Sequence, residues 1–594
     1  MMLRLTRIAT SRAATFRPTW IPKRNFIIAP PKNEHVYNIA LFVMGFGLAY
    51  FAGSLSFGPQ LEVLVNAHQK AKELEMEEAA KKEALQLELN DSSSYSIDSS
   101  SNQDHELSST PLESDHSPSP IDEAESSSNE IENNIQTKIP QIRTTFRAKY
   151  VLVGGGTAAY SAYETIKKHE PNADVLIVSK EDLPPYTRPP LSKELWFSDD
   201  SLAESLQYKD WNGKNKNVLY KSKADYETEG TKLILGREAV KMHPDRNLIE
   251  LNDGSYIIYQ KLLIATGGSP RNPDFLQNLS PSTMENVSTY RGLNDYQKIR
   301  KLVKEGKEIA IIGGGFLGSE LSCAIANEQR KLNGPSRVTQ IYPEEGNMSN
   351  IFPRYLSNWT KNRLEKFGVN IKSECSVKKL AVDENEGKVT IKTNKEDIKA
   401  DHVIVAAGIE PNVSLGESGN LEIDEVNGGI VVNKELSATS NVWIAGDVCS
   451  YHDVVLGRRR VEHYEHAVYS GQVAAKNMMG FKDEYTHQPM FWSDLGPEIS
   501  YEAVGTLDSK MMTVSVWAKE VEGEEKFDRG LVFYLKNDVI TGLLLFNLPN
   551  RISLARKIIK SRMNSKDIEK VANAFEIHEP RNPNVKTEEM ESSN

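Results

Sequence analysis

Apolar runs that end in small residues recur along the chain and predict the buried strands of parallel sheets, because such strands are covered on both faces. The runs at 151–153 and 309–312 each lead into a glycine-rich turn, after which a helix is expected. Three further runs, at 262–268 (LLIATGG), 403–412 (VIVAAGIEPN) and 442–447 (VWIAGD), end in the same way. This order of strand, turn and helix predicts βαβ units and therefore an α/β fold.

The two glycine-rich turns have the spacing of dinucleotide-binding loops. The first is GGGTAA at 154–159, and the second is GGGFLG at 313–318. Glycine allows the tight turn and the close approach of a pyrophosphate, and the free N–H groups at the start of the following helix bind it. We therefore expect two dinucleotides to bind one chain.

Acidic residues that follow the later strands are candidates for binding ribose hydroxyls. In the first unit we assign this role to Glu181, because Lys180 stands where an acid usually ends the strand. In the second unit Glu344 would accept from both ribose hydroxyls and repel a 2′-phosphate, which predicts NADH rather than NADPH. Asp447 would reach a hydroxyl or a phosphate, and Gly446 lets the backbone approach the ligand.

The N-terminal residues follow a different pattern. Residues 1–33 are basic and contain no acid, as in a mitochondrial transit peptide. The uncharged run 36–60 is long enough to form a transmembrane helix, and the charges around it favour an N-terminus in the matrix and the rest of the chain in the intermembrane space. We expect a charged helical stalk over 61–90, a disordered acidic linker over 91–146 and a disordered tail over 580–594.

Composition limits the partners that the folded part can have. The chain has 594 residues, enough for roughly three or four domains. Its formal net charge is −11, and residues 91–136 alone hold 11 Asp and Glu without any Lys or Arg. The remainder is neutral overall and lacks the strongly basic character of dedicated DNA-binding proteins. The three cysteines, Cys323, Cys375 and Cys449, form no CxxC pair, which excludes a local redox dithiol, and we assign no metal site.

Several longer strings give a more specific indication. They are YTRPPLSKELWFSDD (186–200), EEGNM (344–348), YLSNWT (355–360), RRRVEH (458–463) and FWSDLGP (491–497). The order of the two glycine turns, the ATG at 265–267 and the GD at 446–447 adds to these strings. Together they resemble, over about residues 147–577, the apoptosis-inducing factor family, which is similar to flavin disulfide reductases. The resemblance implies two Rossmann-like domains, with the NAD domain inserted into the FAD domain, and an α+β C-terminal domain. The implied boundaries are 147–270 and 409–488 for FAD, 271–408 for NAD and 489–579 for the C-terminal domain.

The resemblance also implies the residues that contact each cofactor. For FAD these are Gly154, Gly155, Gly156, Thr157, Ala158, Glu181, Arg188, Lys193, Val240, Arg291, Asp447, His463, Tyr464 and Trp492. For NADH they are Gly314, Gly315, Phe316, Leu317, Glu344, Gly408, Glu462, His463, Trp492, Glu502 and Asn550. Arg188 would bind the diphosphate as a fork, and Asp447 would accept from the ribityl chain.

The residues implied for the hydride path are Phe316, Lys193, Glu320, His463 and Trp492. A buried pair of Lys193 with Glu320 would stabilise a reduced, anionic flavin. The alternative is that both are ordinary surface charges. Aromatic rings, Phe491 among them, would stack around the nicotinamide and the flavin.

The activity implied is that of an FAD-dependent NADH oxidoreductase of the mitochondrial inner membrane, facing the intermembrane space. Without a CxxC, the electron acceptor is a quinone, a one-electron protein carrier or oxygen. The family also implies a role in respiratory-chain maintenance and, after proteolytic release to the nucleus or cytosol, in caspase-independent cell death. The implied partners are NADH, the inner membrane, a second copy in an NADH-dependent dimer, an intermembrane-space import oxidoreductase and, after release, DNA or poly(ADP-ribose). Two alternatives stay open, namely a redox-sensing scaffold of low turnover that NADH switches, and a plain NADH:quinone or ferredoxin-type reductase.

Three departures from the family pattern bear on these expectations. Lys180 replaces an acid, and Asn350 stands where the pattern offers a lysine to the nucleotide, so NADH affinity is expected to differ. A long insertion in the C-terminal domain is reduced to Ala518–Asp528, which removes a switch that depends on its release. The basic amphipathic segment 551–563 would suit a nucleic acid, poly(ADP-ribose) or an acidic protein, but a solvated helix face is the favoured reading.

Overall fold

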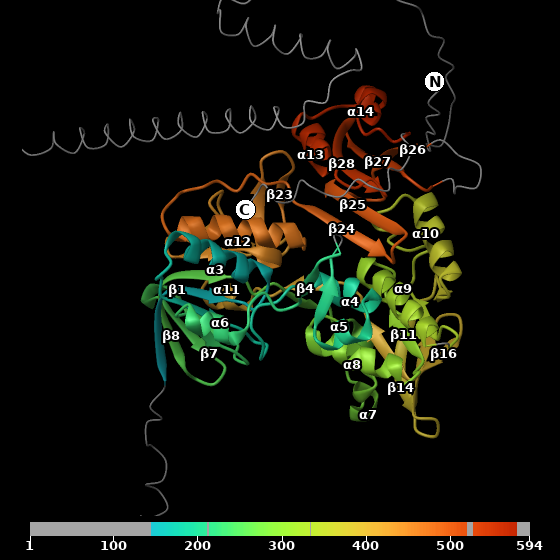
Figure 1. Ribbon diagram of the computed structural model, residues 1–594, viewed down its shortest axis with the longest axis horizontal. Helices are drawn as coiled ribbons and strands as arrows, with labels where there is room; N and C mark the ends of the chain where they lie inside the picture. The colour runs from blue at the N-terminus through green and yellow to red at the C-terminus, as the bar shows by residue number, and fades with distance from the viewer. Residues whose placement is uncertain (1–143, 211–212, 333, 519–526, 579–594) are drawn as a thin grey trace, which may run out of the picture. The chain divides into compact units, whose positions relative to one another are not determined.

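The computed structural model describes residues 144–210, 213–332, 334–518 and 527–578 (Figure 1). The predicted transit peptide, membrane anchor, stalk, most of the acidic linker and the C-terminal tail lie outside the described residues. Within the described ranges, no helix combines the length and the apolar character needed to span a bilayer.

The predicted end of the acidic linker at residue 146 is wrong. Thr145 and Phe146 already belong to the first strand, β1 (Thr145–Val153). They pair in parallel with Tyr256 and Ile257 at the start of β8 (Tyr256–Ile264), so backbone pairing orders a segment whose composition alone indicates a linker.

The first glycine turn belongs to a mostly parallel sheet. Its strand order is β20-β21-β8-β1-β2-β5, and β8 also pairs with β7 of the β6–β7 hairpin. Strands β1, β2, β5, β8 and β21 run parallel, while β20 is antiparallel to β21. The bounds of the strands not yet given are β2 (Val175–Val178), β5 (Lys232–Ile234), β6 (Ala239–His243), β7 (Leu248–Leu251), β20 (Ser437–Thr439) and β21 (Val442–Ile444).

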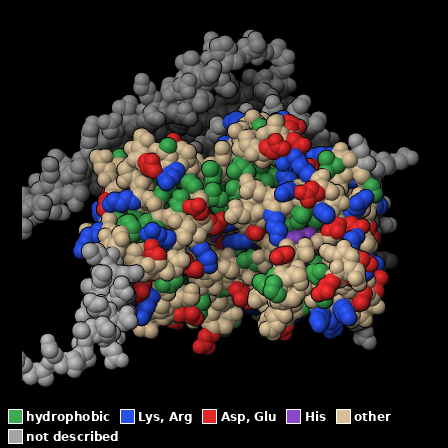
Figure 2. All heavy atoms as spheres, turned by 90° about the horizontal axis from the view of Figure 1, so that it is seen from below, with side chains coloured by type: hydrophobic (Ala, Val, Ile, Leu, Met, Phe, Trp, Pro, Cys, Tyr) green, Lys and Arg blue, Asp and Glu red, His purple; other side chains and the backbone are tan. Residues whose placement is uncertain are grey.

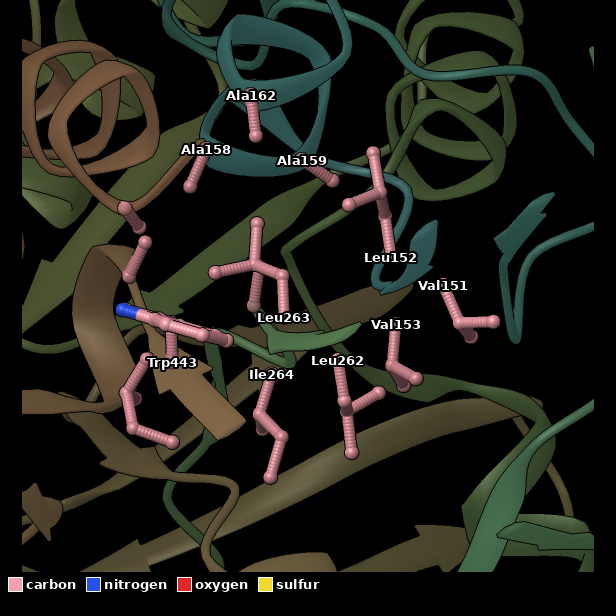
Figure 3. Packing of buried hydrophobic residues seen from close by; sticks show 14 of the residues in the cluster. Val151, Leu152, Val153, Ala158, Ala159, Ala162, Leu262, Leu263, Ile264 and Trp443 are labelled. Carbon is pink, nitrogen blue, oxygen red and sulfur yellow. The ribbon is translucent and has the colours of Figure 1, made fainter. Parts of the chain in front are cut away.

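Two helices, α3 (Thr157–His169) and α12 (Tyr464–Met478), pack against each other beside this sheet. Their backbones approach closely, because a Cβ on Gly471 would lie 2.3 Å from the carbonyl oxygen of Ala158. Figure 3 shows Ala158, Ala159 and Ala162 of α3 facing the apolar side chains of β1 and β8. The small residues of α3 therefore set how closely the helix that follows the glycine turn lies on the sheet.

The second glycine turn belongs to a separate parallel sheet of order β10-β17-β11-β12-β13. Its strands are β10 (Val287–Thr289), β11 (Ile309–Ile312), β12 (Val338–Ile341), β13 (Asn370–Lys372) and β17 (His402–Val405). Its longer helices are α8 (Leu293–Lys304), α9 (Phe316–Lys331) and α10 (Arg354–Lys366). A three-stranded antiparallel sheet, β14 (Val377–Asp383), β15 (Lys388–Thr393) and β16 (Asp397–Ala400), lies between β13 and β17 in the chain.

The chain passes between the two parallel sheets through a short antiparallel pair. Strand β9 (Gly268–Pro270) follows β8 of the first sheet, and β18 (Ile409–Pro411) follows β17 of the second. These two strands lie in the apolar runs 262–268 and 403–412 or directly after them. A Cβ on Gly268 would lie 2.8 Å from the carbonyl oxygen of Glu410, so the close crossing requires glycine there.

A third, antiparallel sheet has the order β24-β25-β28-β27-β26. Alternation along β28 (Val539–Phe546) decides what covers each face. Leu543 and Leu545 pack with Ala555 and Ile559 of α13 (Ile552–Lys560), whereas Leu544 and Phe546 pack with residues of the second α/β unit. The other elements are β24 (Met490–Leu495), β25 (Ile499–Gly505), β26 (Met512–Trp517), β27 (Gly530–Lys536) and α14 (Ile568–Asn573).

The remaining short elements connect these three parts. They are α4 (Glu194–Phe197), α5 (Asp200–Glu204), α6 (Lys223–Thr228), α7 (Pro281–Glu285), α11 (Ser414–Ser418), β3 (Gln207–Lys209), β4 (Asn215–Asn217), β19 (Ile430–Val431), β22 (Cys449–Asp453) and β23 (Gly457–Arg459). Acidic and basic side chains are interspersed over the face seen in Figure 2.

Candidate dinucleotide-binding cavity

A cavity of about 1010 Å³ brings together both glycine turns, the VWIAGD segment, the RRRVEH segment and β24. Nineteen of the predicted site residues line it: Gly154, Gly155, Gly156, Thr157, Ala158, Glu181, Arg188, Lys193, Arg291, Gly315, Phe316, Leu317, Glu320, Gly408, Asp447, Glu462, His463, Tyr464 and Trp492. Residues more than 300 positions apart in the sequence therefore face one space, large enough for elongated ligands.

The first glycine turn has the geometry that phosphate binding requires. Gly154 has φ +141°, and a Cβ there would lie 2.2 Å from the carbonyl oxygen of Ala265. A Cβ on Gly155 would lie 2.3 Å from the hydroxyl of Ser179, whereas one on Gly156 would meet no atom within 4 Å. The turn therefore packs tightly on its inner side, and Gly156 opens toward the cavity at the start of α3.

The second glycine turn repeats this arrangement. Gly313 has φ +133°, and a Cβ there would lie 2.2 Å from the carbonyl oxygen of Ala406. A Cβ on Gly315 would meet no atom within 4 Å, as at Gly156. The third glycine of the motif, Gly318, is also tightly packed, because a Cβ there would lie 2.3 Å from the carbonyl oxygen of Gly313. The two turns thus offer two similar anion-binding positions.

A buried polar network supports the second turn from below, and the sequence motif did not reveal it. The Asn347 amide donates to Ser319 (2.7 Å) and to Gln340 (3.0 Å) and accepts from the hydroxyl of Tyr342 (2.7 Å). Gln340 in turn donates to the carbonyl of Gly313 at 2.9 Å. Such satisfied buried networks fix one conformation of the backbone they bind.

Five of the predicted contact residues lie outside the lining of the cavity: Val240, Gly314, Glu344, Glu502 and Asn550. Gly314 faces the ring of Tyr342, 2.6 Å from an added Cβ, and Val240 is 45% exposed on β6. Glu502 lies opposite Trp492 on β25, and Asn550 is exposed just before α13. Their contacts with a dinucleotide stay predictions.

Ion pairs place charge along the wall of the cavity. The guanidinium of Arg188 pairs with the carboxylate of Glu181, which also accepts from the hydroxyl of Tyr186. Nη2 of Arg291 lies 3.0 Å from Oδ2 of Asp447. Lys180, at the position of the missing acid, pairs instead with Glu238 at 3.0 Å. Each cation is therefore held in place by an acid, with donors left over for a phosphate.

Lys193 and Glu320 form the ion pair that the resemblance suggested, and they are not surface charges. Nζ of Lys193 lies 2.8 Å from Oε2 of Glu320, and the side chains are only 10% and 5% exposed. Glu320 also accepts from the hydroxyls of Ser192 (2.6 Å) and Ser493 (2.7 Å). Ser493 was not predicted, although alternation along β24 places it opposite in direction to Trp492.

Aromatic side chains form a wall on one side of the cavity. The rings of Phe491 and His463 are 5.0 Å apart, those of Phe491 and Phe316 are 5.2 Å apart, and those of Tyr464 and Trp492 are 5.7 Å apart. We call His463, Tyr464, Phe491 and Trp492 the aromatic wall. Burial, with a smaller effect of the Arg459 charge, lowers the pKa of His463 to about 3, so its ring is neutral near pH 7.

Two polar atoms of this wall lack hydrogen-bond partners among the described residues, which shows whether the residues fit a bound dinucleotide. Nδ1 of His463 and Nε1 of Trp492 are buried and make no hydrogen bond within the described chain. Buried donors and acceptors are rarely left without partners, so a polar ligand in this space would satisfy both. The residues present therefore fit FAD and NADH.

The buried carboxyl group of Asp494 on β24 is expected to make the stability of the protein depend on pH. Burial raises its pKa to about 7, with Ser500 and Lys193 opposing and Glu320 and Glu194 adding to the rise. The unfolded chain releases this proton near pH 4, so stability falls as the pH rises from about 4 to about 7. We expect Asp494→Asn to be more stable than the parent protein near pH 8, by up to about 4 kcal/mol for a shift of about 3 pKa units.

The measurement is urea unfolding of both proteins at several pH values. The advantage of the variant should shrink through pH 7 and vanish near pH 4. Asp245→Asn is the control, because the Asp245 side chain is 74% exposed and should have no effect at any pH. An advantage of Asp494→Asn that is the same at all pH values would contradict the assigned cause.

The three cysteines do not supply a redox partner for this cavity. Cys323, Cys375 and Cys449 are all buried and free. Burial raises the pKa of Cys323 to about 12 and raises that of Cys449 further, so neither is a thiolate near neutral pH.

Comparison with known proteins gives consistent results for most of the described chain. Residues 148–471 match the model of the pyridine nucleotide-disulphide oxidoreductase family. Residues 474–526 and 520–561 match the model of the C-terminal region of mitochondrion-associated apoptosis-inducing factor.

Two curated relatives extend over most of the chain. The mitochondrial apoptosis-inducing factor 1 of Dictyostelium discoideum is 40% identical over 469 residues, covering 77% of this chain and 87% of the relative. A putative mitochondrial apoptosis-inducing factor 1 of Drosophila melanogaster is 38% identical, covering 72% of this chain and 65% of the relative, which is slightly less than two thirds of its length.

Solved structures share the fold at lower identity. The covalent complex of putidaredoxin reductase with putidaredoxin matches with a TM-score of 0.60 and 23% identity over 72% of this chain and 99% of the other. The water-forming NADH oxidase of Lactobacillus brevis, bound to NADH, matches with a TM-score of 0.58 and 19% identity over 71% of this chain and 92% of the other. At these identities the likeness extends to the Rossmann-like fold alone.

Proposed function

Because this chain is an apoptosis-inducing-factor-like member of the pyridine nucleotide-disulphide oxidoreductase family, we propose that its cavity binds FAD at the first glycine turn and NADH at the second, for hydride transfer between them. The chain is an FAD-dependent NADH oxidoreductase. The observation that carries the assignment of positions is the convergence of two similar glycine turns on one cavity.

The residues of the chain have separate tasks in this proposal. Gly156 and Arg188 would hold the diphosphate of FAD, and Asp447 would accept from its ribityl hydroxyls. FAD, when bound, supplies the group that accepts a hydride. Lys193 brings a fixed positive charge into a buried space, where charge acts more strongly than in water.

The aromatic wall and the neutral imidazole complete the site. Phe316 and the wall would orient the nicotinamide and exclude water from the transfer. With its pKa near 3, His463 cannot serve as a general acid near pH 7, so it would act by stacking and by hydrogen bonding.

Reduction by NADH tests this function directly. Anaerobic mixing of the purified flavoprotein with NADH in a stopped-flow spectrophotometer should bleach the flavin absorption near 450 nm, roughly the band of oxidised flavins. NADPH should react more slowly, since Glu344 at the end of the second unit's strand would repel a 2′-phosphate. A protein that neither nucleotide reduces would rule out the proposal.

The acceptor of the electrons is proposed to lie outside the chain, because no dithiol is present in the sequence to receive them. A protein carrier of single electrons is the first candidate, supported by relatives that are themselves named ferredoxin and rubredoxin NAD(+) reductases. Screening the NADH-reduced protein with ferredoxin-type proteins, quinones and oxygen will separate the candidates by their reoxidation rates.

We further propose a mitochondrial location, facing the intermembrane space from the inner membrane. The basic, acid-free residues 1–33 and the uncharged run 36–60 support it, as do the names of the two curated relatives. The acidic segment between residues 91 and 137 is then the position that we propose for proteolytic release. Fractionation of cells that express the tagged full chain, before and after a death stimulus, tests both location and release.

A second candidate function is a binding protein that NADH switches, with roles in respiratory-chain maintenance and cell death. The match of residues 474–561 to the C-terminal region of apoptosis-inducing factor favours it. NADH would then bring about dimer formation and present a surface to an import oxidoreductase or, after release, to DNA or poly(ADP-ribose). Size-exclusion chromatography with and without NADH discriminates, because fast turnover without any change in size favours the plain reductase.

A further inference from the structure

One carboxylate, that of Glu465, joins the two segments that carry the aromatic wall. Glu465 lies in the first turn of α12, directly after His463 and Tyr464. Its Oε2 accepts from the backbone N–H of Met490 at 2.6 Å, and Met490 directly precedes Phe491 and Trp492. The two halves of the wall, whose first rings, His463 and Phe491, are 28 positions apart in the sequence, are thus connected at their base.

The same carboxylate oxygen also receives two side chains from outside the wall. The guanidinium of Arg556 on α13 pairs with it, and Nε2 of His487 lies 3.2 Å away. Arg556 additionally donates from Nε to the carbonyl of Gln488 at 2.8 Å. The ring of His487 stacks on Tyr469 of α12 with centroids 3.8 Å apart. The carboxylate therefore connects α12, the 487–490 segment and α13, and the arginine holds that segment a second time.

The surroundings of Glu465 keep its carboxylate ionised. Burial raises the pKa of Glu465, but the contact with His487 and the charge of Arg556 outweigh this effect, so the pKa is lowered overall. The first turn of a helix also favours an acid, because the helix dipole is positive there. Hydrogen bonds to an ionised, half-buried acceptor are the stronger kind.

The aromatic wall has little else of its own to set its geometry. The centroids of the contacting rings are 5.0 Å and 5.7 Å apart, and such contacts favour a mutual angle of two rings without fixing where the pair lies on the backbone. Nδ1 of His463 and Nε1 of Trp492 make no hydrogen bond within the described chain, and the His463 ring interacts with the backbone of Pro489, next to Met490. The backbone positions from which the rings project must therefore fix the wall.

We propose that Glu465 is a positioning residue for the NADH oxidoreductase reaction, which aligns His463 and Tyr464 with Phe491 and Trp492 and is itself held by Arg556. This inference rests on the function proposed above. Glu465 does not line the cavity and acts only through the backbone on either side of the wall. It also connects the wall to α13, on whose outer side Lys557 and Lys560 are exposed.

The test uses the full-length holoprotein and compares four variants. Glu465→Gln keeps the shape and one acceptor but loses the charge. Arg556→Ala removes the partner, and Arg556→Lys keeps its charge. Arg551→Ala is the matched control, because Arg551 adjoins the same helix. This substitution also removes an ion pair, that of Arg551 with Glu576 at 2.7 Å, which has no contact with the wall. Stopped-flow reduction at increasing NADH concentrations gives the limiting rate and the half-saturating concentration separately.

We expect Glu465→Gln and Arg556→Ala to lower the limiting rate by about 10- to 100-fold, since a displacement of about 1 Å costs a factor of this order. FAD content should be unchanged, and Arg556→Lys should recover part of the rate. The visible absorption and circular dichroism of the bound oxidised flavin should shift in the same two variants, without any NADH present. Arg551→Ala should match the parent protein in all three measurements.

Equal rates and spectra for Glu465→Gln and the parent protein would overturn the inference, as would an equal loss in Arg551→Ala. If Glu465→Gln does not fold, Arg556→Lys and Arg556→Ala decide, because identical behaviour of these two excludes a role for the charge. If the parent protein is not reduced by NADH, the proposed function fails instead. The spectra of the oxidised flavin then still report whether Glu465 positions the wall.

Discussion

Glu320→Gln is expected to lower the free energy of unfolding by roughly 3–5 kcal/mol, because it leaves the ammonium group of Lys193 buried without a counter-charge. The substitution changes only one atom, so packing is preserved and the amide can still bond to Ser192 and Ser493. Urea unfolding of the variant and its parent gives the difference. The half-exposed pair of Lys232 with Asp174, at 2.9 Å, provides the control, and Asp174→Asn should cost less than about 1 kcal/mol.

A double variant separates the structural role of this pair from its role in the reaction. In Lys193→Met with Glu320→Gln both charges of the ion pair are gone, and both serines keep a partner. Replacing both members of a buried ion pair by neutral groups is often close to neutral for stability, so most of the loss should be recovered. Flavin reduction by NADH should nevertheless stay about 100-fold slow, since the fixed charge beside the cofactor is gone. Recovery of both stability and rate would show that the pair serves the fold alone.

The parts of the site that were predictable from sequence are those encoded in short motifs. The glycines of the turns at 154–159 and 313–318 indicate the backbone geometry directly, because a positive φ or a neighbouring carbonyl oxygen leaves no room for a side chain. The strand before the second turn and the last three residues of the strand before the first, 151–153, were predictable from their continuous apolar character. The Lys193–Glu320 pair came from resemblance, since nothing in the spacing of two residues 127 positions apart indicates contact.

The parts that were not predictable depend on contacts between distant segments. The network of Asn347 beneath the second turn needs strand β12 and helix α9 to be placed first. Gly314 has the residue type of a ligand contact, yet the ring of Tyr342 occupies the space beside it. From the sequence alone, Glu465 would likewise be interpreted as an ordinary acid in the first turn of a helix. Its connections to Met490 and Arg556 exist only because the third sheet meets α12.

The assignment of one cofactor to each glycine turn predicts a reciprocal result for two alanine variants. Gly156 and Gly315 occupy equivalent positions, and an added Cβ at either meets no protein atom within 4 Å. Their φ angles of −108° and −76° also suit alanine, so neither variant should be strained. Each methyl group would instead enter the space that a pyrophosphate needs at the start of α3 or α9.

Gly156→Ala should therefore weaken FAD binding by about 10- to 100-fold, equivalent to about 1.4–2.7 kcal/mol, and should be purified with little flavin. Gly315→Ala should keep a full complement of FAD while the half-saturating NADH concentration rises about tenfold, because the second turn would bind only NADH. The measurements are flavin content after dialysis and stopped-flow reduction after saturation with FAD. Loss of flavin from Gly315→Ala with retention in Gly156→Ala would reverse the assignment. Loss from both would instead mean that FAD contacts both turns, and the division of the cavity into two cofactor positions would then have to be abandoned.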